Sequence, residues 1–313
     1  ASSSSADLNA TYGYNSAGCV TNITYTGSGN NENIGLSWNG QYQLTEVTTN
    51  GTAVERNGFD ALGRRAWNAS INSAQVWETN YFICDGVHVL AEVDSTGGLK
   101  RAYTHGPGVD NWLAMTVYTG ATVKTYFYLT DHQGTVHAVA DETGSIAESY
   151  RYDAGGRVIG VYDSNNQQLN NSAIGNRYLW QGREYSWKTG LYFFRARWYD
   201  PITGRWLSND PIGISGGLNQ YVFCDNSPIG FIDPSGLEDI NLYQKDSRER
   251  TASDLRTSGE NEITIGGHGA DGVAVDLRTG KAKVVTPEEL AKQIKNLPNY
   301  DPKKEVKLGT CEG

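Results

Sequence analysis

Two pairs of residues in this 313-residue sequence are of types that could do chemistry. Asp210 and Asp233 each begin an Asp-Pro-x-Gly stretch, and two carboxyl groups held close together share one proton, so that one acts as a base and the other as an acid. His268 and Cys311 combine an imidazole with a thiol, and a nearby imidazole activates a thiolate. The alternatives are simple turns for the first pair, and a turn histidine and a buried thiol for the second.

The elements around the aspartates read as repeated β-hairpins. An irregular pattern, aromatic-x-aromatic-Asp/Asn-x-x-Gly-x-aliphatic, recurs before them. Its clearest copies are YGYNSAGCV from residue 12, NGFDALGRR from 57, YLTDHQGTV from 128, YRYDAGGRV from 150 and RWYDPITGRW from 197. In each, Asp or Asn bonds its own backbone and Gly takes the positive φ of the turn. A lone hairpin cannot bury its aromatic face, so we predict a mainly β fold in which the hairpins stack into a long sheet and the aromatic residues pack it.

After Leu237 the composition changes, and charged residues rise from about 15 to about 34 percent. Residues 238–260 read as a linker or one short helix. Beyond them the pattern predicts a strand at 262–266, a hairpin at 273–285, a helix at 286–298 and a strand at 305–309. A right-handed crossover pairs the two outer strands in parallel and places His268 and Cys311 just past their carboxyl ends.

Bulk properties exclude several function classes. The net charge of -9 and the lack of a Lys/Arg cluster argue against nucleic acid or an anionic membrane as a direct partner. No apolar run approaches the roughly 20 residues of a membrane span. The amino terminus has neither Met nor a signal sequence, so we expect a fragment or a processed product. No disulfide framework, metal or cofactor is expected, because the cysteines are few and scattered and the histidines lack metal-ligand spacing.

The repeat resembles the YD repeat of the RHS family of polymorphic toxins. The stretch from YFFRARWYDPITGRW to NSPIGFIDPSGL closely resembles the RHS-associated core that ends the repeat region. The resemblance implies a β-shell that encloses a toxin and a core that plugs one end. It divides the chain into a shell segment (1–190), the core (191–237) and the amino-terminal part of a toxin domain (238–313).

The resemblance also implies self-cleavage directly after the second motif, between Leu237 and Glu238, with Asp210 and Asp233 as an aspartic-protease pair. Three arginines just upstream could hold a carboxylate or orient the core, or could be solvated charges at a strand edge. They are Arg195, Arg197 and Arg205.

In the tail, the His-Gly and Cys motifs resemble those of clan CD cysteine peptidases, which have the caspase-like fold. Gly266, Gly267 and Gly269 would then shape the loop and offer N–H groups to an oxyanion. Because the chain stops two residues after Cys311, we expect little or no peptidase activity from it.

Three functions remain open on the sequence: a self-cleaving toxin-delivery protein, a structural or adhesive surface protein whose Asp-Pro-x-Gly stretches are only turns, and a cage for a non-peptidase toxin. The family resemblance implies that the protein is made in the bacterial cytoplasm and exported. It also implies three partners: the upstream shell, an immunity protein, and a type VI spike or toxin-complex translocation machinery.

Overall fold

The computed structural model describes residues 9–27, 32–72 and 74–237, and beyond them the backbone of five strands at 240–241, 262–270, 273–276, 283–285 and 305–310. The chain divides into two compact units. The first comprises Ala1–Pro228 with Asp233–Glu238, and the second comprises Ile229–Ile232 with Asp239–Gly313. Within the described residues, no helix is long and apolar enough to cross a membrane.

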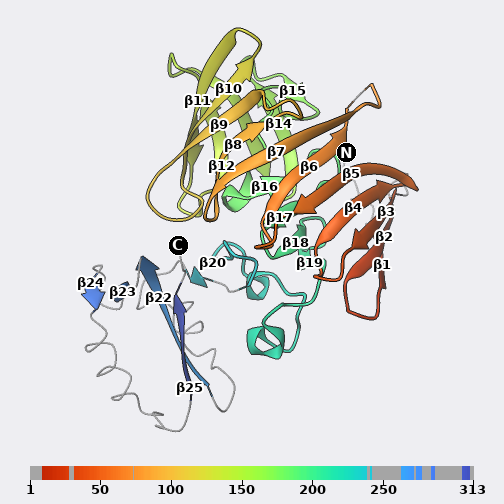
Figure 1. Ribbon diagram of the computed structural model, residues 1–313, viewed down its shortest axis with the longest axis vertical. Coiled ribbons are helices and arrows are strands. Elements are labelled where there is room, and N and C mark those ends of the chain that lie inside the picture. The colour runs from red at the N-terminus through yellow and green to blue at the C-terminus, as the bar shows by residue number, and fades with distance from the viewer. Residues whose placement is uncertain are drawn as a thin grey trace, which may run out of the picture. The chain divides into compact units, whose positions relative to one another are not determined.

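The first unit is built on one antiparallel sheet of 15 strands that follow each other in chain order (Figure 1). The strands are β1 Asn9–Tyr14, β2 Val20–Thr26, β3 Glu32–Trp38, β4 Leu44–Thr49, β5 Thr52–Phe59, β6 Arg65–Ile71, β7 Trp77–Asp85, β8 His88–Val93, β9 Leu99–His105, β10 Trp112–Thr119, β11 Thr122–Thr130, β12 Val136–Ala140, β13 Ile146–Tyr152, β14 Val158–Asp163 and β15 Gln168–Leu169. The expected mainly β fold of stacked hairpins is confirmed.

The predicted Asp/Asn turn is present and repeats with one geometry. In nine copies, side-chain Oδ1 accepts hydrogen bonds from the backbone N–H groups two and four residues later, as Asp60 does from Leu62 and Arg64, both at 2.9 Å. The same pattern occurs at Asn15, Asn39, Asn72, Asp94, Asp131, Asp141, Asp153 and Asp163. The residue three positions after the Asp or Asn takes a positive φ, and in most copies it is Gly, which adopts that conformation without strain. The predicted copy at Asp200 differs, because Ile202 N donates to Oδ1 but Gly204 N donates to the Asp200 backbone carbonyl.

A second, smaller sheet of four antiparallel strands follows the large one. It contains β16 Glu184–Tyr185, β17 Tyr192–Phe194, β18 Arg197–Asp200 and β19 Arg205–Trp206. Three short 3-10 turns flank it, η1 Trp180–Gly182, η2 Gly213–Gly216 and η3 Cys224–Asn226. Because β16 pairs with β17, the small sheet begins before residue 191, where the sequence analysis starts the core.

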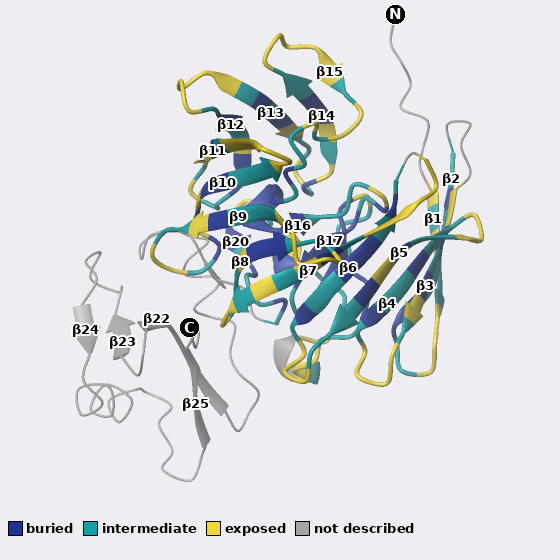
Figure 2. Ribbon diagram, turned by 45° about the horizontal axis from the view of Figure 1, so that its top comes forward, coloured by how far each residue is buried: buried dark blue, intermediate teal, exposed yellow. Residues whose placement is uncertain are grey.

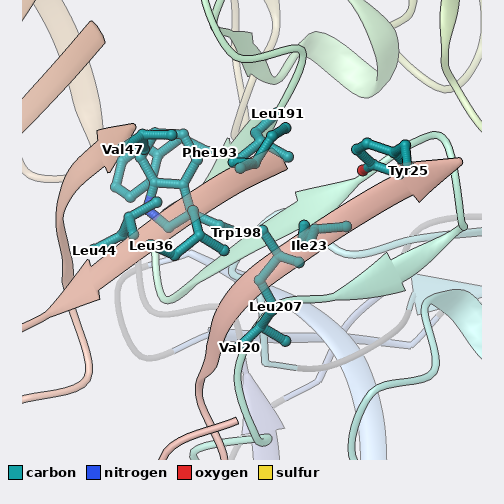
Figure 3. Packing of buried hydrophobic residues seen from close by; sticks show 11 residues of the cluster. Val20, Ile23, Tyr25, Leu36, Leu44, Val47, Leu191, Phe193, Trp198 and Leu207 are labelled. Atoms are coloured by element: carbon teal, nitrogen blue, oxygen red, sulfur yellow. The ribbon is translucent and has the colours of Figure 1, made fainter. Parts of the chain in front are cut away.

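The small sheet packs against strands β2–β4 through a hydrophobic cluster (Figure 3). The cluster contains Val20, Ile23, Tyr25, Ile34, Leu36, Leu44, Val47, Leu191, Phe193, Trp198 and Leu207. On β2 the buried residues Ile23 and Tyr25 alternate with half-buried ones, as expected for a strand with one face on a core. This burial explains why aromatic residues recur with the hairpins.

Polar contacts fasten both ends of the large sheet to the same small sheet. Tyr192 and Tyr199 donate hydrogen bonds to the carbonyls of Gly156 and Gly155, both at 2.8 Å. Tyr25, on β2, donates to Asp200 at 2.8 Å. In Figure 2 the buried residues gather where the strands face β16 and β17, and the exposed ones gather at the hairpin loops. The small sheet therefore lies at the centre of the first unit.

In the second unit, β20 Phe231–Ile232 pairs with β21 Ile240–Asn241. A further sheet has the order β24-β23-β22-β25, with β22 Glu262–Ala270, β23 Val273–Asp276, β24 Lys283–Val285 and β25 Glu305–Thr310. The predicted parallel pairing of 262–266 with 305–309 is confirmed in register, and so is the hairpin of β23 and β24. Strand β21 lies where the sequence predicts a linker or a short helix, and the predicted helix at 286–298 lies outside the described residues.

Candidate functional site: two aspartates on a buried arginine

The candidate site is organised by Arg197, the first residue of β18. Its side chain is 3% exposed, and its guanidinium carbon lies 4.1 Å from the centroid of the Trp206 ring on β19. A buried cation over an aromatic face is stabilised by the ring quadrupole, but it still needs anionic partners. The hairpin between β17 and β18 thus places one positive charge inside the protein.

Asp210 and Asp233 are those partners. Nη1 of Arg197 lies 2.8 Å from Oδ2 of Asp210, and Nη2 lies 3.2 Å from Oδ2 of Asp233. The side chains of Asp210 and Asp233 are 8% and 0% exposed. The two residues expected to act together are therefore held on one guanidinium, although they are 23 positions apart in the sequence.

Each aspartate also forms the turn that the simpler interpretation predicts. Oδ1 of Asp210 accepts a hydrogen bond from Ile212 N at 3.0 Å. Oδ1 of Asp233 accepts from Gly236 N at 2.8 Å and from Leu237 N at 3.1 Å, and also from the hydroxyl of Ser235 at 3.1 Å. Each carboxylate therefore uses one oxygen for its turn and the other for Arg197, so the turn and the site are compatible.

The chain segment before the expected scissile bond is fixed to the β17–β18 hairpin, residue by residue. Arg195 donates from Nη1 to the carbonyl of Pro234, and Arg197 donates from Nε to the carbonyl of Gly236. Between them, Ala196 N donates to the carbonyl of Ser235 at 3.1 Å. Three successive carbonyls are thus bound by residues 195, 196 and 197 in the same order, and Leu237 N, directly after them, donates to Asp233.

Burial and charge act in opposite directions on Asp210. Burial raises the pKa of this carboxyl above its ordinary value, and the neighbouring Arg197 lowers it only in part. Asp210 therefore holds a proton more readily than a solvated aspartate does. This raised pKa suits Asp210 to act as an acid.

Arg195 is held in place by Asp110, a residue that the sequence analysis did not select. Nη2 and Nη1 of Arg195 lie 2.7 and 3.0 Å from Oδ1 and Oδ2 of Asp110. Arg183 reaches Oδ2 of the same carboxylate at 2.6 Å. Burial alone would raise the pKa of Asp110, but Arg183 and Arg195 bring it below the ordinary value, so it stays ionised at neutral pH.

Arg205 lies apart from this cluster. Its guanidinium carbon lies 5.3 Å from the ring centroid of Tyr12 and 5.4 Å from that of Tyr221, and no ion pair joins it to either aspartate among the described residues. Its contacts are therefore with aromatic rings, and of the three predicted arginines only Arg195 and Arg197 lie at the site.

The second predicted pair is described only in part. His268 lies inside β22, where it pairs with Val275, because β22 continues against β23 after its last parallel pair, Gly267 with Thr310. The expectation that His268 follows the end of the strand is therefore wrong. Cys311 lies outside the described residues.

No group of three or more potential metal ligands is present among the described residues. Cys19 and Cys224 are buried, as expected for packing residues, and Cys84 is half-buried. The most important residues that sequence reasoning missed are Asp110 and Arg183. Neither lies in the repeat pattern, so no local signal could have selected them.

A curved antiparallel sheet of Asp/Asn-turn hairpins around a small central sheet defines a YD-shell protein. The chain belongs to the family described as "Teneurin YD-shell", whose profile matches residues 9–229. A second profile, "Domain of unknown function (DUF8616)", matches residues 238–313.

Curated relatives and a solved structure share this part of the chain. The "Putative uncharacterized protein YibJ" of Escherichia coli (strain K12) is 35% identical over 196 residues, which cover 62% of this chain and 78% of YibJ. The "tRNA nuclease WapA" of Bacillus subtilis (strain 168) is 28% identical over 260 residues, which cover 72% of this chain but 11% of WapA. The "Crystal Structure of TcdB2-TccC3" has a similar fold over 73% of this chain and 14% of that one, with a TM-score of 0.52 and 20% identity.

The close packing of Gly236 generates a test of the site. Gly236 has φ +75°, and a Cβ there would collide with the carbonyl of Phe194 and lie 3.0 Å from Arg197 N. Since overpacking costs about 1–3 kcal/mol, we expect Gly236→Ala to displace residues 234–237 and to speed amide hydrogen exchange at Ala196 about tenfold.

The control is Gly144→Ala, because Gly144 has a similar φ of +82° but open space around it. This variant has the same backbone strain and should leave exchange at Ala196 unchanged. Equal exchange at Ala196 in both variants would contradict the tight fit of Gly236.

Proposed function

We propose that this chain is the carboxy-terminal part of a YD-repeat toxin-delivery protein, and that its core cuts the chain between Leu237 and Glu238 to free the domain that follows. One observation carries the proposal: Arg197 holds Asp210 and Asp233 together, while Asp233 accepts a hydrogen bond from Leu237 N. Turns alone do not require two distant carboxylates to share a buried guanidinium.

The arrangement supports an acid–base hydrolysis. Asp233 accepts hydrogen bonds as an ionised carboxylate does, so it serves as the base that takes a proton from water. Asp210, whose pKa burial raises, donates its proton to the reacting amide. The water oxygen bonds to the Leu237 carbonyl carbon, the bond to the Glu238 nitrogen breaks, and the products are a carboxyl group on Leu237 and an amine on Glu238.

The role of Arg197 differs from the expectation of two carboxyls in direct contact. A guanidinium between two carboxylates reduces their mutual repulsion and fixes their separation. The pair can therefore hold one proton or none without leaving the site. Under the proposal, Arg197 also fixes the Gly236 carbonyl, one residue before the reacting one.

The delivery role is supported by the family and by the position of the boundary. The second family profile begins at residue 238, directly after the proposed cut. Among the relatives, WapA is named a tRNA nuclease, so a protein that shares this part of the chain can carry an enzyme. We propose that residues 238–313 belong to such a cargo, that the protein is exported, and that its partners are an upstream shell, an immunity protein and a type VI spike or toxin-complex machinery.

The intact mass of the freshly purified chain tests the cut. We expect wild type to give two fragments that meet at Leu237 and Glu238, and Asp210→Asn and Asp233→Asn to stay whole. Asn keeps the side-chain oxygen that accepts the turn hydrogen bonds but cannot transfer a proton. The effect expected is a loss of cleavage of at least about a hundredfold, the usual contribution of an acid or base.

Asp141→Asn is the matched control, because Asp141 forms the same kind of turn on the surface of the sheet, with Thr143 N and Ser145 N. It should be cut like wild type. A wild-type chain that stays whole would favour the structural or adhesive function, in which both motifs are only turns.

The pH dependence of the cut tests the assignment of the acid. As pH rises through the raised pKa of Asp210, this residue loses the proton that it must donate, so the cleavage rate should fall toward neutral and alkaline pH. The measurement is the first-order rate after refolding at a series of pH values. A rate that rises steadily up to pH 8 would mean that Asp210 is not the acid.

The tail supports a second proposal, a cysteine peptidase activity in the cargo. We infer it from the parallel register of β22 and β25, in which Gly267 pairs with Thr310, so that the residues next in sequence are His268 and Cys311. An imidazole at this place could activate the thiol. The contrasting possibility is a non-peptidase toxin, in which Cys311 has no chemical role.

Alkylation of the thiols distinguishes the two. If His268 activates Cys311, His268→Ala should slow the reaction of Cys311 with iodoacetamide near pH 6.5 about tenfold, because less thiolate is present. Cys84, whose pKa burial raises, is the internal control and should react slowly in both chains. Unchanged labelling of Cys311 would favour the non-peptidase toxin.

A further inference from the structure

Asp110 is a buried carboxylate far from the cleavage motifs in sequence. It lies in the connection between β9 and β10, its side chain is 9% exposed, and it has a positive φ of +57°. A positive φ and the burial of a charged carboxylate both cost free energy, so the contacts of Asp110 must offset that cost. The contacts are made by Arg183 and Arg195, and each arginine also binds a second part of the chain.

Both arginines continue from Asp110 to the β17–β18 hairpin and the segment on it. Arg183 donates from Nη2 to the carbonyl of Phe193 at 3.0 Å. Arg195, held on both oxygens of Asp110, donates from Nη1 to the carbonyl of Pro234 and from Nη2 to that of Val87 at 3.4 Å. Asp110 thus connects strands of the large sheet to the residue that follows Asp233.

We propose that Asp110 is a positioning residue for the chain cleavage: it fixes Arg195 on the Pro234 carbonyl and so holds residues 234–237 in place for Asp210 and Asp233. This inference rests on the proposed function. No described contact joins Asp110 to either aspartate or to Leu237, so it acts through Arg195. The bidentate geometry matters, because a forked ion pair fixes the plane of the guanidinium as well as its position.

Loss of the Asp110 charge leaves the buried Arg183 and the partly buried Arg195 without the carboxylate between them. Burial and the neighbouring Arg195 already lower the pKa of Arg183, and the side chain of Arg195 is 22% exposed, so it has a path toward solvent. Arg195 also has an unfavourable φ of +59° that its contacts must offset. The Pro234 carbonyl would then lose its donor, and the segment before the scissile bond would loosen.

The cleavage rate of the full chain is the first readout. Asp110→Asn should slow the cut by about tenfold to a hundredfold, which is what a small misplacement of reacting groups costs. Glu92→Gln is the matched control. Glu92 is also fully buried and pairs with two arginines, Arg101 and Arg177, but none of these has a described contact with residues 233–237. A general loss of stability would slow both variants alike and would overturn the proposal.

A double variant tests whether Asp110 acts through Arg195. Arg195→Met removes the connection itself, so Asp110→Asn combined with Arg195→Met should be no slower than Arg195→Met alone. Effects that multiply would mean that Asp110 acts by another route and would overturn the proposal.

Hydrogen exchange separates this inference from the proposed function. In an Asp210→Asn background, which stays whole, we expect Asp110→Asn to speed amide exchange at Ala196, Gly236 and Leu237 about tenfold and Glu92→Gln to leave it unchanged. Unchanged exchange in Asp110→Asn overturns the positioning role. If wild type is never cut but exchange rises as expected, the proposed function fails and the positioning of residues 234–237 stands.

Discussion

The structure of the core depends on one buried cation. The Arg197 guanidinium lies over Trp206, contacts Asp210 and Asp233, and donates to the Gly236 carbonyl. A charge this deeply buried is tolerated only when nearly all its donors are bound, because removing one partner of such a cluster costs about 3–5 kcal/mol. Because Arg197 needs anionic partners, the turns at Asp210 and Asp233 both pack against the β17–β18 hairpin.

The large sheet makes that burial possible. Hairpins of the YD type present aromatic and aliphatic residues on one face, and the small sheet β16–β19 fills the space that this face would otherwise leave. The large sheet and its loops also supply distant charges: Asp110, between β9 and β10, fixes Arg195, and Arg65, on β6, contacts Glu184 on β16. The shell therefore acts as a scaffold that sets the positions of charged residues in the core as well as enclosing them.

Much of the fold could be predicted because its signals are local. An Asp or Asn that accepts hydrogen bonds from the N–H groups two and four residues later depends only on residues of its own loop. The turns at Asn15, Asp60 and Asp131 can therefore be predicted from the sequence. The turns at Asn72 and Asp163 depart from the pattern, because Gln75 and Asn166 take the positive φ where the pattern has Gly. At these two turns the flanking strands, β6 with β7 and β14 with β15, are paired, and the pairing stabilises a positive φ at a residue that adopts it less readily than Gly.

The sequence by itself determined the hairpins, the doubled Asp-Pro-x-Gly motif and the change of composition after Leu237, since each depends on neighbouring residues. Only the tertiary structure decided which charges meet. It joined Asp210 and Asp233 through Arg197, excluded Arg205, brought in Asp110 and Arg183, and kept His268 within β22. The physical reason is that ion pairing in a core depends on which segments burial brings together. The local sequence of a segment does not indicate a partner that lies a hundred residues away.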